Sequence, residues 1–434
     1  MSHMILNQLL NRSLPVLTAW LLFATGVQPS TTYNLAAIHF TGLHRYTPEQ
    51  GIAASGLHIG DSTTLGDLQA AAERLSKTGA FDSVSFQYSS RGNDLTAQFG
   101  FTETKDVLPC IFDNFVWFTD AEIDRMLRQR VTFYTGEAPV RGDTVEQIRG
   151  ALQDLLHTNG IGGEVSEIPY GGLGSVNALL FHVDGISQPI KSIAFSGELA
   201  VTDKQLSDAS ITLRSQNFSV TNVASYTSSA LLPLYYQRGY LRSKFGRVEA
   251  KLVDANSKGP TSEVSITLPV AEGNQYLWNG ASWAGNQVLS ASELGKLLGM
   301  NQQEVANQEK IDAGFNSARK AYESQGYIDV RVSPIRDLDD TAKLVSYTVQ
   351  VAEGSQYHMG QVYFDGLPQG VAAALLKKWK LKPGDVFDAS YPDDFLKNTV
   401  DQELAQAGST PRRIGMKRET DATALIVNLR IQYH

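Results

Sequence analysis

The sequence has 434 residues, a length that corresponds to about three domains of average size. Hydrophobic residues make up 42% and charged residues 19%, so the chain can build a core and is not generally disordered. The net charge of −8 argues against a nucleic-acid partner and against direct binding of anionic lipid headgroups, and the single Cys110 excludes an intrachain disulfide and a CxxC site.

Residues 1–30 predict a secretory signal peptide. Arg12 is the only charged residue in this stretch, an apolar run covers residues 14–24, and Ala24-Thr25-Gly26 supplies small residues for cleavage. The run is shorter than the ~20 residues that a comfortable bilayer span needs, although an uncleaved inner-membrane anchor is the alternative. We therefore expect the mature chain to fold outside the cytoplasm without disulfides, in a bacterial periplasm.

A repeated motif follows the signal segment. In five places an apolar stretch ends in aromatic-x-Gly or aromatic-x-Asn, which suits a strand that turns sharply through a positive φ. The five motifs are Phe40-Thr41-Gly42, Phe112-Asp113-Asn114, Phe195-Ser196-Gly197, Trp283-Ala284-Gly285 and Phe364-Asp365-Gly366.

A helix start lies at a fixed distance after four of these motifs. Each has a hydroxyl residue five positions later and Glu or Gln three positions beyond that, the pattern of a capping box. The fifth copy has Pro368-Gln369-Gly370 in this region, so its first helix is expected to begin differently. The four pairs are Thr47/Gln50, Thr119/Glu122, Thr202/Gln205 and Ser290/Glu293.

A second helix and two strands complete each repeat. The helices are expected to stop at Gly79, Gly160, Gly239, Gly326 and Gly408. Alternating apolar positions then predict two half-buried strands, for example at Val345, Tyr347, Val349 and Val351. In this α+β reading there are five tandem β-α-α-β-β modules of about 80 residues, each a three-stranded mixed sheet covered by two helices. The expected modules are residues 31–105, 106–187, 188–273, 274–354 and 355–434, after the signal peptide at 1–30.

The order of these elements resembles POTRA (polypeptide-transport-associated) domains. Gly239-Tyr240-Leu241 and Gly326-Tyr327-Ile328 match the family's entry to its second strand, and Leu381-Lys382-Pro383-Gly384-Asp385 is similar to its turn between helices. The second copy departs from the pattern with Gly160-Ile161-Gly162-Gly163, and the fifth with Gly408-Ser409-Thr410-Pro411. The resemblance covers about residues 33–434.

The resemblance implies a role in front of a membrane barrel, as in outer-membrane assembly factors of the BamA type. The sequence ends in an expected strand at residues 429–434, so we expect a standalone periplasmic array, possessing no barrel of its own. Two alternatives stay open. One is the truncated periplasmic part of a barrel-bearing assembly factor, and the other is an envelope or cell-division scaffold with an uncleaved anchor.

The expected partners are unfolded or extended polypeptides, or an outer-membrane β-barrel protein. They would add as an extra strand to an open sheet edge, so the chain would reach the membrane only through a partner, in the periplasm and in association with the outer membrane. The resemblance points to the second strand of a module as this edge. The candidate residues are Ser243, Phe245, Arg247, Glu249 and Lys251 in the third module, and Ile328, Val330 and Val332 in the fourth.

Enzyme motifs are not found in the sequence. The eight histidines show no metal-ligand spacing, and no G-x-S-x-G elbow occurs. The glycine-rich residues 171–175 are expected in a hairpin turn, and a phosphate loop there lacks a following helix. Asp337, Asp339 and Asp340 suit a solvated hairpin tip better than a calcium site. Cys110 is expected to be a buried small hydrophobe, and no catalytic residue or cofactor is predicted.

Overall fold

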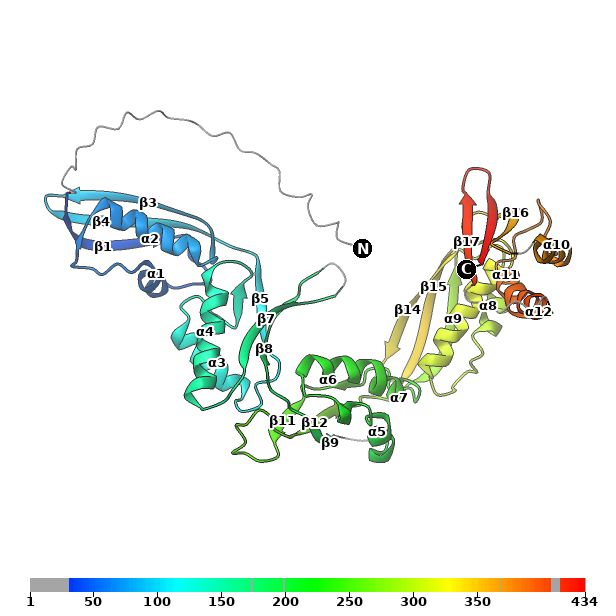
Figure 1. Cartoon of the computed structure of the whole chain (residues 1–434), viewed down its shortest axis with the longest axis horizontal. Helices are drawn as coiled ribbons and strands as arrows, with labels where there is room; N and C mark the ends of the chain where they lie inside the picture. The colour runs from blue at the N-terminus through cyan, green and yellow to red at the C-terminus, as the bar shows by residue number, and fades with distance from the viewer. Residues whose placement is uncertain (1–30, 173–174, 198–199, 368, 407–413, 434) are drawn as a thin grey trace. The chain divides into compact units, whose positions relative to one another are not determined.

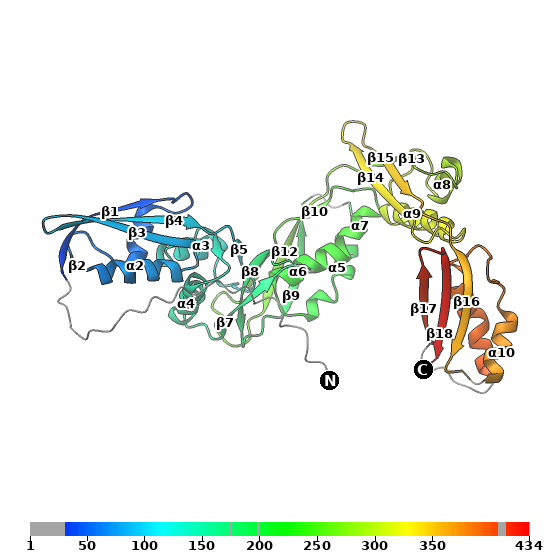
Figure 2. The same cartoon turned by 90° about the horizontal axis from the view of Figure 1, so that it is seen from above.

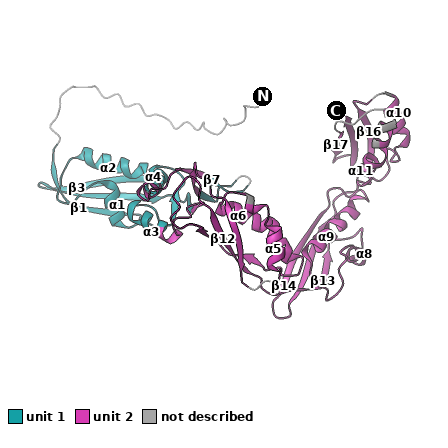
Figure 3. Ribbon diagram, turned by 60° about the horizontal axis from the view of Figure 1, so that its bottom comes forward, with its two compact units in different colours: residues 1–110, 123–152, 169–179 teal, residues 111–122, 153–168, 180–434 magenta. Residues whose placement is uncertain are grey.

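The computed structural model describes residues 31–172, 175–197, 200–367, 369–406 and 414–433. The chain divides into two compact units, which Figure 3 shows in teal and magenta. Unit 1 comprises residues 1–110, 123–152 and 169–179, and unit 2 comprises residues 111–122, 153–168 and 180–434. The expected signal peptide, residues 1–30, lies outside the described ranges. Within those ranges, no helix is both long and apolar enough to cross a membrane.

The first sheet lies in unit 1 and has the strand order β2-β1-β4-β3. Strand β1 runs parallel to β4, and β3 pairs with β4 in antiparallel fashion (Figure 1). Its elements are β1 (Tyr33–Thr41), α1 (Pro48–Ser55), β2 (Ser62–Thr63), α2 (Leu65–Lys77), β3 (Phe81–Arg91) and β4 (Asp94–Glu103).

The second sheet has the order β6-β5-β8-β7, and its segments contribute to both units. Gly160 adopts φ +69°, as expected for a helix stop, and the next strand begins at Glu164. The elements are β5 (Val107–Phe112), α3 (Asp120–Arg130), β6 (Glu137–Pro139), α4 (Asp143–Thr158), β7 (Glu164–Tyr170) and β8 (Ala178–Asp184).

The third sheet belongs to unit 2. Strand β12 is central, with β9 parallel on one side and the antiparallel β10 and β11 on the other. The strands are β9 (Ile190–Ser196), β10 (Lys244–Phe245), β11 (Glu249–Leu252) and β12 (Val264–Ala271). The helical segments are α5 (Asp203–Ala209), a 3₁₀ turn (Leu213–Ser215), α6 (Val220–Tyr226), a π-helical turn (Thr227–Leu231) and α7 (Leu232–Tyr236).

Two three-stranded sheets complete unit 2, with the orders β13-β15-β14 and β16-β18-β17 (Figure 2). The fourth set of elements is β13 (Leu277–Ala284), α8 (Ala291–Leu297), α9 (Gln308–Glu323), β14 (Arg331–Asp339) and β15 (Leu344–Ala352). The fifth set is β16 (His358–Asp365), α10 (Gln369–Lys378), α11 (Tyr391–Phe395), a π-helical turn (Leu396–Val400), α12 (Asp401–Gln406), β17 (Ile414–Asp421) and β18 (Ile426–Tyr433).

The α+β class is confirmed, but two details of the expected module differ. Only the fourth and fifth sheets have three strands, because in the first two sheets a short segment between the helices pairs with the first strand, and in the third the outer strand is interrupted. The third and fifth sets also contain more than two helical segments. Each π-helical turn divides what would otherwise be one longer second helix.

The repeated local signals have a clear structural basis. All four expected capping boxes form, as at Ser290 and Glu293, where each residue's amide is bonded by the other's side chain. The strand-end glycines at positions 42, 197, 285 and 366 have φ between +77° and +115°. A Cβ at Gly285 would lie 2.2 Å from the carbonyl oxygen of Val351, so the close approach of the last strand also requires glycine here.

Asn114 occupies the equivalent position in the second copy, but it does not adopt a positive φ. The expected left-handed turn is therefore wrong for this copy. The Asn114 side chain instead bonds the last part of β8 directly: its Oδ1 accepts from the Val183 amide at 2.8 Å, and its Nδ2 donates to the Val183 carbonyl at 3.1 Å. The Asn114 carboxamide thus holds the last strand of this copy by two hydrogen bonds. In the copies with glycine, the backbone at this position itself comes close to the last strand.

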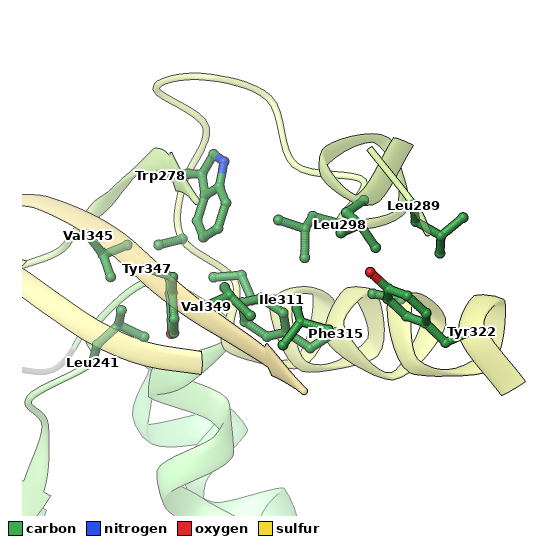
Figure 4. Packing of buried hydrophobic residues seen from close by; sticks show 14 of the residues in the cluster. Leu241, Trp278, Leu289, Leu298, Ile311, Phe315, Tyr322, Val345, Tyr347 and Val349 are labelled. Carbon is green, nitrogen blue, oxygen red and sulfur yellow. The ribbon is translucent and has the colours of Figure 1, made fainter. Parts of the chain in front are cut away.

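In the core beside the fourth sheet, helix α9 packs against strand β15. Figure 4 shows side chains of α9 directed at strand β15, and the rings of Phe315 and Tyr347 lie 5.2 Å apart. Spacing at i, i+4, i+7 and i+11 places the buried side chains of α9 on one face. These core residues are Ile311, Phe315, Ala318 and Tyr322 from α9, and Val345, Tyr347, Val349 and Val351 from β15.

Other expectations have mixed outcomes. The glycine-rich residues 171–175 connect β7 and β8, and the Asn177 amide donates to the Tyr170 carbonyl at 2.7 Å, although residues 173–174 lie outside the described ranges. Cys110 lies on β5 and is partly exposed, so its expected burial is wrong. Pro368 and the segment Gly408–Pro411 also fall outside the described residues.

Candidate functional site

The third and fourth sheets each end in an open strand, as Figures 1 and 2 allow the reader to follow. Strands β10 and β11 form one border of the third sheet, and β14 forms one border of the fourth. Within the described ranges, no further strand pairs with the outer side of these strands. Both borders contain residues that the sequence singled out as partner-binding candidates.

The outer strand of the third sheet changes face in its middle. Phe245 pairs with Val270 and Glu249 pairs with Thr267, so the segment between β10 and β11 contains one residue more than its partner strand. An extra residue of this kind is a β-bulge, which bends the strand and re-aims its side chains. The Gly246 amide still donates to Pro269 at 2.7 Å.

As a result, the five candidates on this strand do not share one face. Ser243 is buried and donates to the Tyr240 carbonyl, and Phe245 packs edge-on against Tyr235. The other three, Arg247, Glu249 and Lys251, are exposed. Between them, Val248, Ala250 and Leu252 pack against the core of the third sheet.

The main chain of β11 has free hydrogen-bonding groups on its outer side. The Val253 amide donates to the Glu263 carbonyl at 2.9 Å, which makes this a hydrogen-bonded pair of the antiparallel ladder. Because such pairs alternate, Lys251 and Glu249 also bond to β12, in register with Ser265 and Thr267. The amides and carbonyls of Ala250 and Leu252 therefore point outward, away from β12.

Most of the candidate residues of the fourth sheet lie before strand β14 begins. Strand β14 begins at Arg331, so Ile328 and Val330 belong to the turn that precedes it. Val330 is buried in the core of the fourth sheet, and Ile328 packs against the core that contains Tyr357. Val332 lies in the strand, pairs with Val351 and is half-buried.

A groove of about 740 Å³ runs beside the open edge of the third sheet. All residues from Arg247 to Leu252 line one wall, and residues 115–120 together with Glu122 line the other. We call this the aromatic groove because Phe115, Trp117 and Phe118 contribute to it. The Trp117 indole donates to the Ser257 carbonyl at 3.0 Å, and the Arg247 side chain forms an ion pair with Asp120, so the two walls are linked at two places.

The second wall is fixed by the buried carboxylate of Asp113. His182 Nδ1 lies 2.9 Å from one of its oxygens, and the other oxygen accepts from the Ser219 hydroxyl at 2.9 Å and from the Thr221 amide and hydroxyl at 3.0 Å. The Val220 amide also donates to the Asp113 carbonyl at 3.1 Å. This network ties the end of β5 to β8 and to the start of α6.

The network shifts the ionisation of both charged members. Burial opposes the charge on Asp113, but the hydrogen bonds from His182, Thr221 and Ser219 outweigh it and lower the pKa of this carboxyl. The hydrogen bond to Asp113 raises the pKa of His182, against a smaller opposing effect of burial. The pair is therefore stabilised in its charged form.

Sequence reasoning missed this second wall. The expected sites were strand residues only, whereas the groove also needs the segment 112–122, more than 120 residues away in the chain. The dense aromatic run Phe112-Asp113-Asn114-Phe115-Val116-Trp117-Phe118, directly after a strand, is the signal that could have indicated it. In the part of the chain that the structure describes, no three or more His, Cys, Asp or Glu side chains are placed so that they could hold a metal ion together.

Comparison with known proteins gives a consistent result. The POTRA family, described as "Surface antigen variable number repeat", matches residues 276–354. An outer membrane protein assembly factor of Treponema pallidum (strain Nichols) is 26% identical over 253 residues, which cover 57% of this chain and 30% of that protein. The outer membrane protein assembly factor BamA of Buchnera aphidicola is 25% identical over 154 residues, or 36% of this chain and 24% of that protein.

The chain thus spans less than a third of the length of these two relatives. Among solved structures, the Haemophilus influenzae BamA POTRA3-5 crystal structure is similar at 18% identity and a TM-score of 0.43, covering 57% of this chain and 96% of that one. Residues 276–354 correspond closely to the fourth repeat found in the sequence, which ends at Gly354. Residues 276–354 thus match the POTRA family, and the chain is similar to outer-membrane protein assembly factors that include BamA.

Proposed function

We propose that this protein binds extended polypeptide segments by β-augmentation, as part of outer-membrane protein assembly or transport. The observation that carries this proposal is the open edge of β11 beside the aromatic groove. The names of the two relatives support the process, and the POTRA match supports the domain type. The protein would act in the periplasm, without enzymatic chemistry, and would reach the outer membrane through a partner such as a β-barrel protein.

The division into five modules is part of the same proposal. Modules at residues 31–105, 106–187, 188–273, 274–354 and 355–434 would each contribute one of the five described sheets. In each sheet the strand that follows the helices lies at a border, so the array would offer several edges of the same kind. The edge of the third sheet has the aromatic groove along it.

An extended chain suits this site better than a small ligand. The outward groups of Ala250 and Leu252 are main-chain donors and acceptors two residues apart, the spacing at which a neighbouring strand bonds. Main-chain bonds recognise any sequence, and side-chain pockets add selectivity. Strands of an unassembled barrel alternate apolar and polar residues, and such strands can present one apolar side to the groove.

Amide hydrogen exchange on the full chain tests this proposal without any mutation. In the free protein, the amides of Ala250 and Leu252 should exchange quickly, while those of Glu249 and Lys251 are already protected by β12. When an unfolded outer-membrane protein is added, Ala250 and Leu252 should become protected and the other two should change little. Glu249 and Lys251 thus serve as matched internal controls on the same strand.

A mutation provides the second arm of the test. Ala250→Pro removes an outward N–H without removing a bond to β12, so capture of the unfolded polypeptide should fall while the sheet stays folded. Ala250→Ser keeps every main-chain group at the same position and should retain capture. If all four amides exchange identically with and without the polypeptide, and Ala250→Pro captures it normally, β-augmentation at this edge is refuted.

A further inference from the structure

The ion pair between Arg247 and Asp120 crosses the aromatic groove. Arg247 lies at the bulge of the outer strand, and Asp120 is the first residue of α3 on the opposite wall. Their side chains are 58% and 40% exposed. An exposed pair of this kind contributes little to stability, so it can open and exchange partners at low cost.

The strand wall of the groove carries more positive than negative charge. Arg247, Lys251 and Lys258 line it, against the single carboxylate of Glu249. Neither lysine forms an ion pair within the described part of the chain. On the opposite wall, the carboxylate of Glu122 is bonded in the capping box with Thr119, and that of Asp113 is saturated by four hydrogen bonds.

The faces of the strand determine where the side chains of an added strand would lie. Val248, Ala250 and Leu252 continue the apolar face of the sheet, while Arg247, Glu249 and Lys251 are exposed on the other face. Side chains of a paired strand alternate in the same way, and opposite charges on neighbouring strands attract. A segment with apolar residues on one face and a carboxylate on the other therefore fits both faces.

We infer that the Arg247–Asp120 ion pair is an exchangeable latch, which selects extended segments that carry a carboxylate on their polar face. This inference rests on the proposed β-augmentation at β11. The incoming carboxylate takes the place of Asp120 as the partner of Arg247, and the apolar face of the segment enters the aromatic groove. Lys251 then provides a second cation four residues further along the chain.

Three short peptides are suitable probes, acetylated and amidated so that their ends carry no charge. They alternate Phe and Thr and differ only in one central polar position, which is Asp, Asn or Lys. The natural full chain should bind the Asp peptide about two- to fivefold more tightly than the Asn peptide, and the Lys peptide more weakly than either. Asp120→Asn removes the competing carboxylate and should strengthen binding of the Asp peptide by a similar factor.

A charge exchange gives the sharpest result. The double variant Asp120→Arg with Arg247→Asp restores the latch with reversed charges, so the preference should invert towards the Lys peptide. Arg247→Gln is the reserve variant if the double variant does not fold, and it should lose most of the preference for the Asp peptide over the Asn peptide. Thermal unfolding of each variant checks that the sheet is intact.

The outcomes separate this inference from the function on which it rests. If all three peptides bind equally to every variant and still protect the amides of Ala250 and Leu252, β-augmentation stands and the latch is overturned. If none of the peptides binds to the natural chain, the proposed edge is wrong and the latch is overturned with it. An unchanged ranking of the peptides in the double variant also overturns it.

Discussion

His182 Nδ1 lies 2.9 Å from the carboxylate of Asp113, and this contact joins the last strand of the second sheet to the segment that forms one wall of the aromatic groove. The Asp113 side chain is 3% exposed and that of His182 is 29% exposed. Asp184 adds a weaker interaction, with 3.9 Å between its carboxylate and His182 Nε2. A buried pair of this kind is costly to break, because each partner would be left charged or unbonded.

Stability should depend on pH through this pair. Asp113 raises the pKa of His182 in the folded protein. The stability that this interaction contributes is therefore complete below the pKa of about 6.5 in the unfolded chain, and it is lost as the pH rises through the higher pKa of the folded state. The lowered pKa of Asp113 adds stability above about pH 4 that is lost on acidification. We expect thermal stability to be highest between about pH 4 and 6.5 and to decline from there towards pH 9.

His182→Gln tests the source of this decline. The variant should be less stable at pH 6 by about 1–2 kcal/mol and should lose most of the slope between pH 6 and 9. His39→Gln replaces an exposed histidine on β1 and should keep the slope of the natural chain. Equal slopes in the natural chain and in His182→Gln would show that the pair does not control this pH dependence.

Local signals in the sequence were sufficient for much of the fold. A capping box needs only two residues three positions apart, so Thr202 and Gln205 could be placed from the sequence alone. The strand-end glycines are equally local, because a positive φ is a property of one residue. The bulge after Phe245 is different: Ser243, Phe245 and Arg247 alternate evenly in the sequence, and only pairing with β12 shows that the strand changes face.

The strand-end glycines should not tolerate a side chain. At Gly285, φ is +84° and a Cβ would lie 2.2 Å from the Val351 carbonyl oxygen. Gly285→Ala should therefore destabilise the protein by about 2 kcal/mol or more. The matched control is Gly295→Ala in α8, where a Cβ meets nothing within 4 Å and the helix should gain about 0.5–1 kcal/mol. Urea unfolding of both variants measures the difference, and equal effects would contradict this reading.

Asn114 should not be replaceable by the glycine found in the other four copies. Its side chain bonds both the amide and the carbonyl of Val183, which is fully buried. Asn114→Gly leaves these two groups unpaired, at a cost of about 1–3 kcal/mol, and Asn114→Ala should cost about the same. If the position required only a flexible turn, Asn114→Gly would be neutral in thermal unfolding, and this result would contradict the side-chain role.

The groove could not be deduced from the sequence, because its two walls come from segments that are far apart in the chain. Its walls come from β11 and from the segment before α3, and their approach depends on the Asp113 network and on the Trp117–Ser257 bond. The residues of that network are separated by more than 100 positions between Asp113 and Thr221. A period-two pattern reports which side of a strand is buried, but it contains no information about which distant segment lies beside the strand's edge.

We expect a proline to limit pairing of further strands at the open edge of the fourth sheet. Pro334 pairs with Val349 within β14 and has no N–H to offer, and proline is tolerated in a sheet where the missing donor faces outward. Pro334→Thr restores that donor next to Ile335, which is 60% exposed, and therefore creates a longer uninterrupted edge. We expect this variant to self-associate more strongly in sedimentation velocity at the same protein concentration.

Ser333→Thr adds the same kind of side chain one residue earlier without adding a donor, and should remain like the natural chain. Equal association of the two variants would mean that the side chain, and not the main-chain donor, controls this edge.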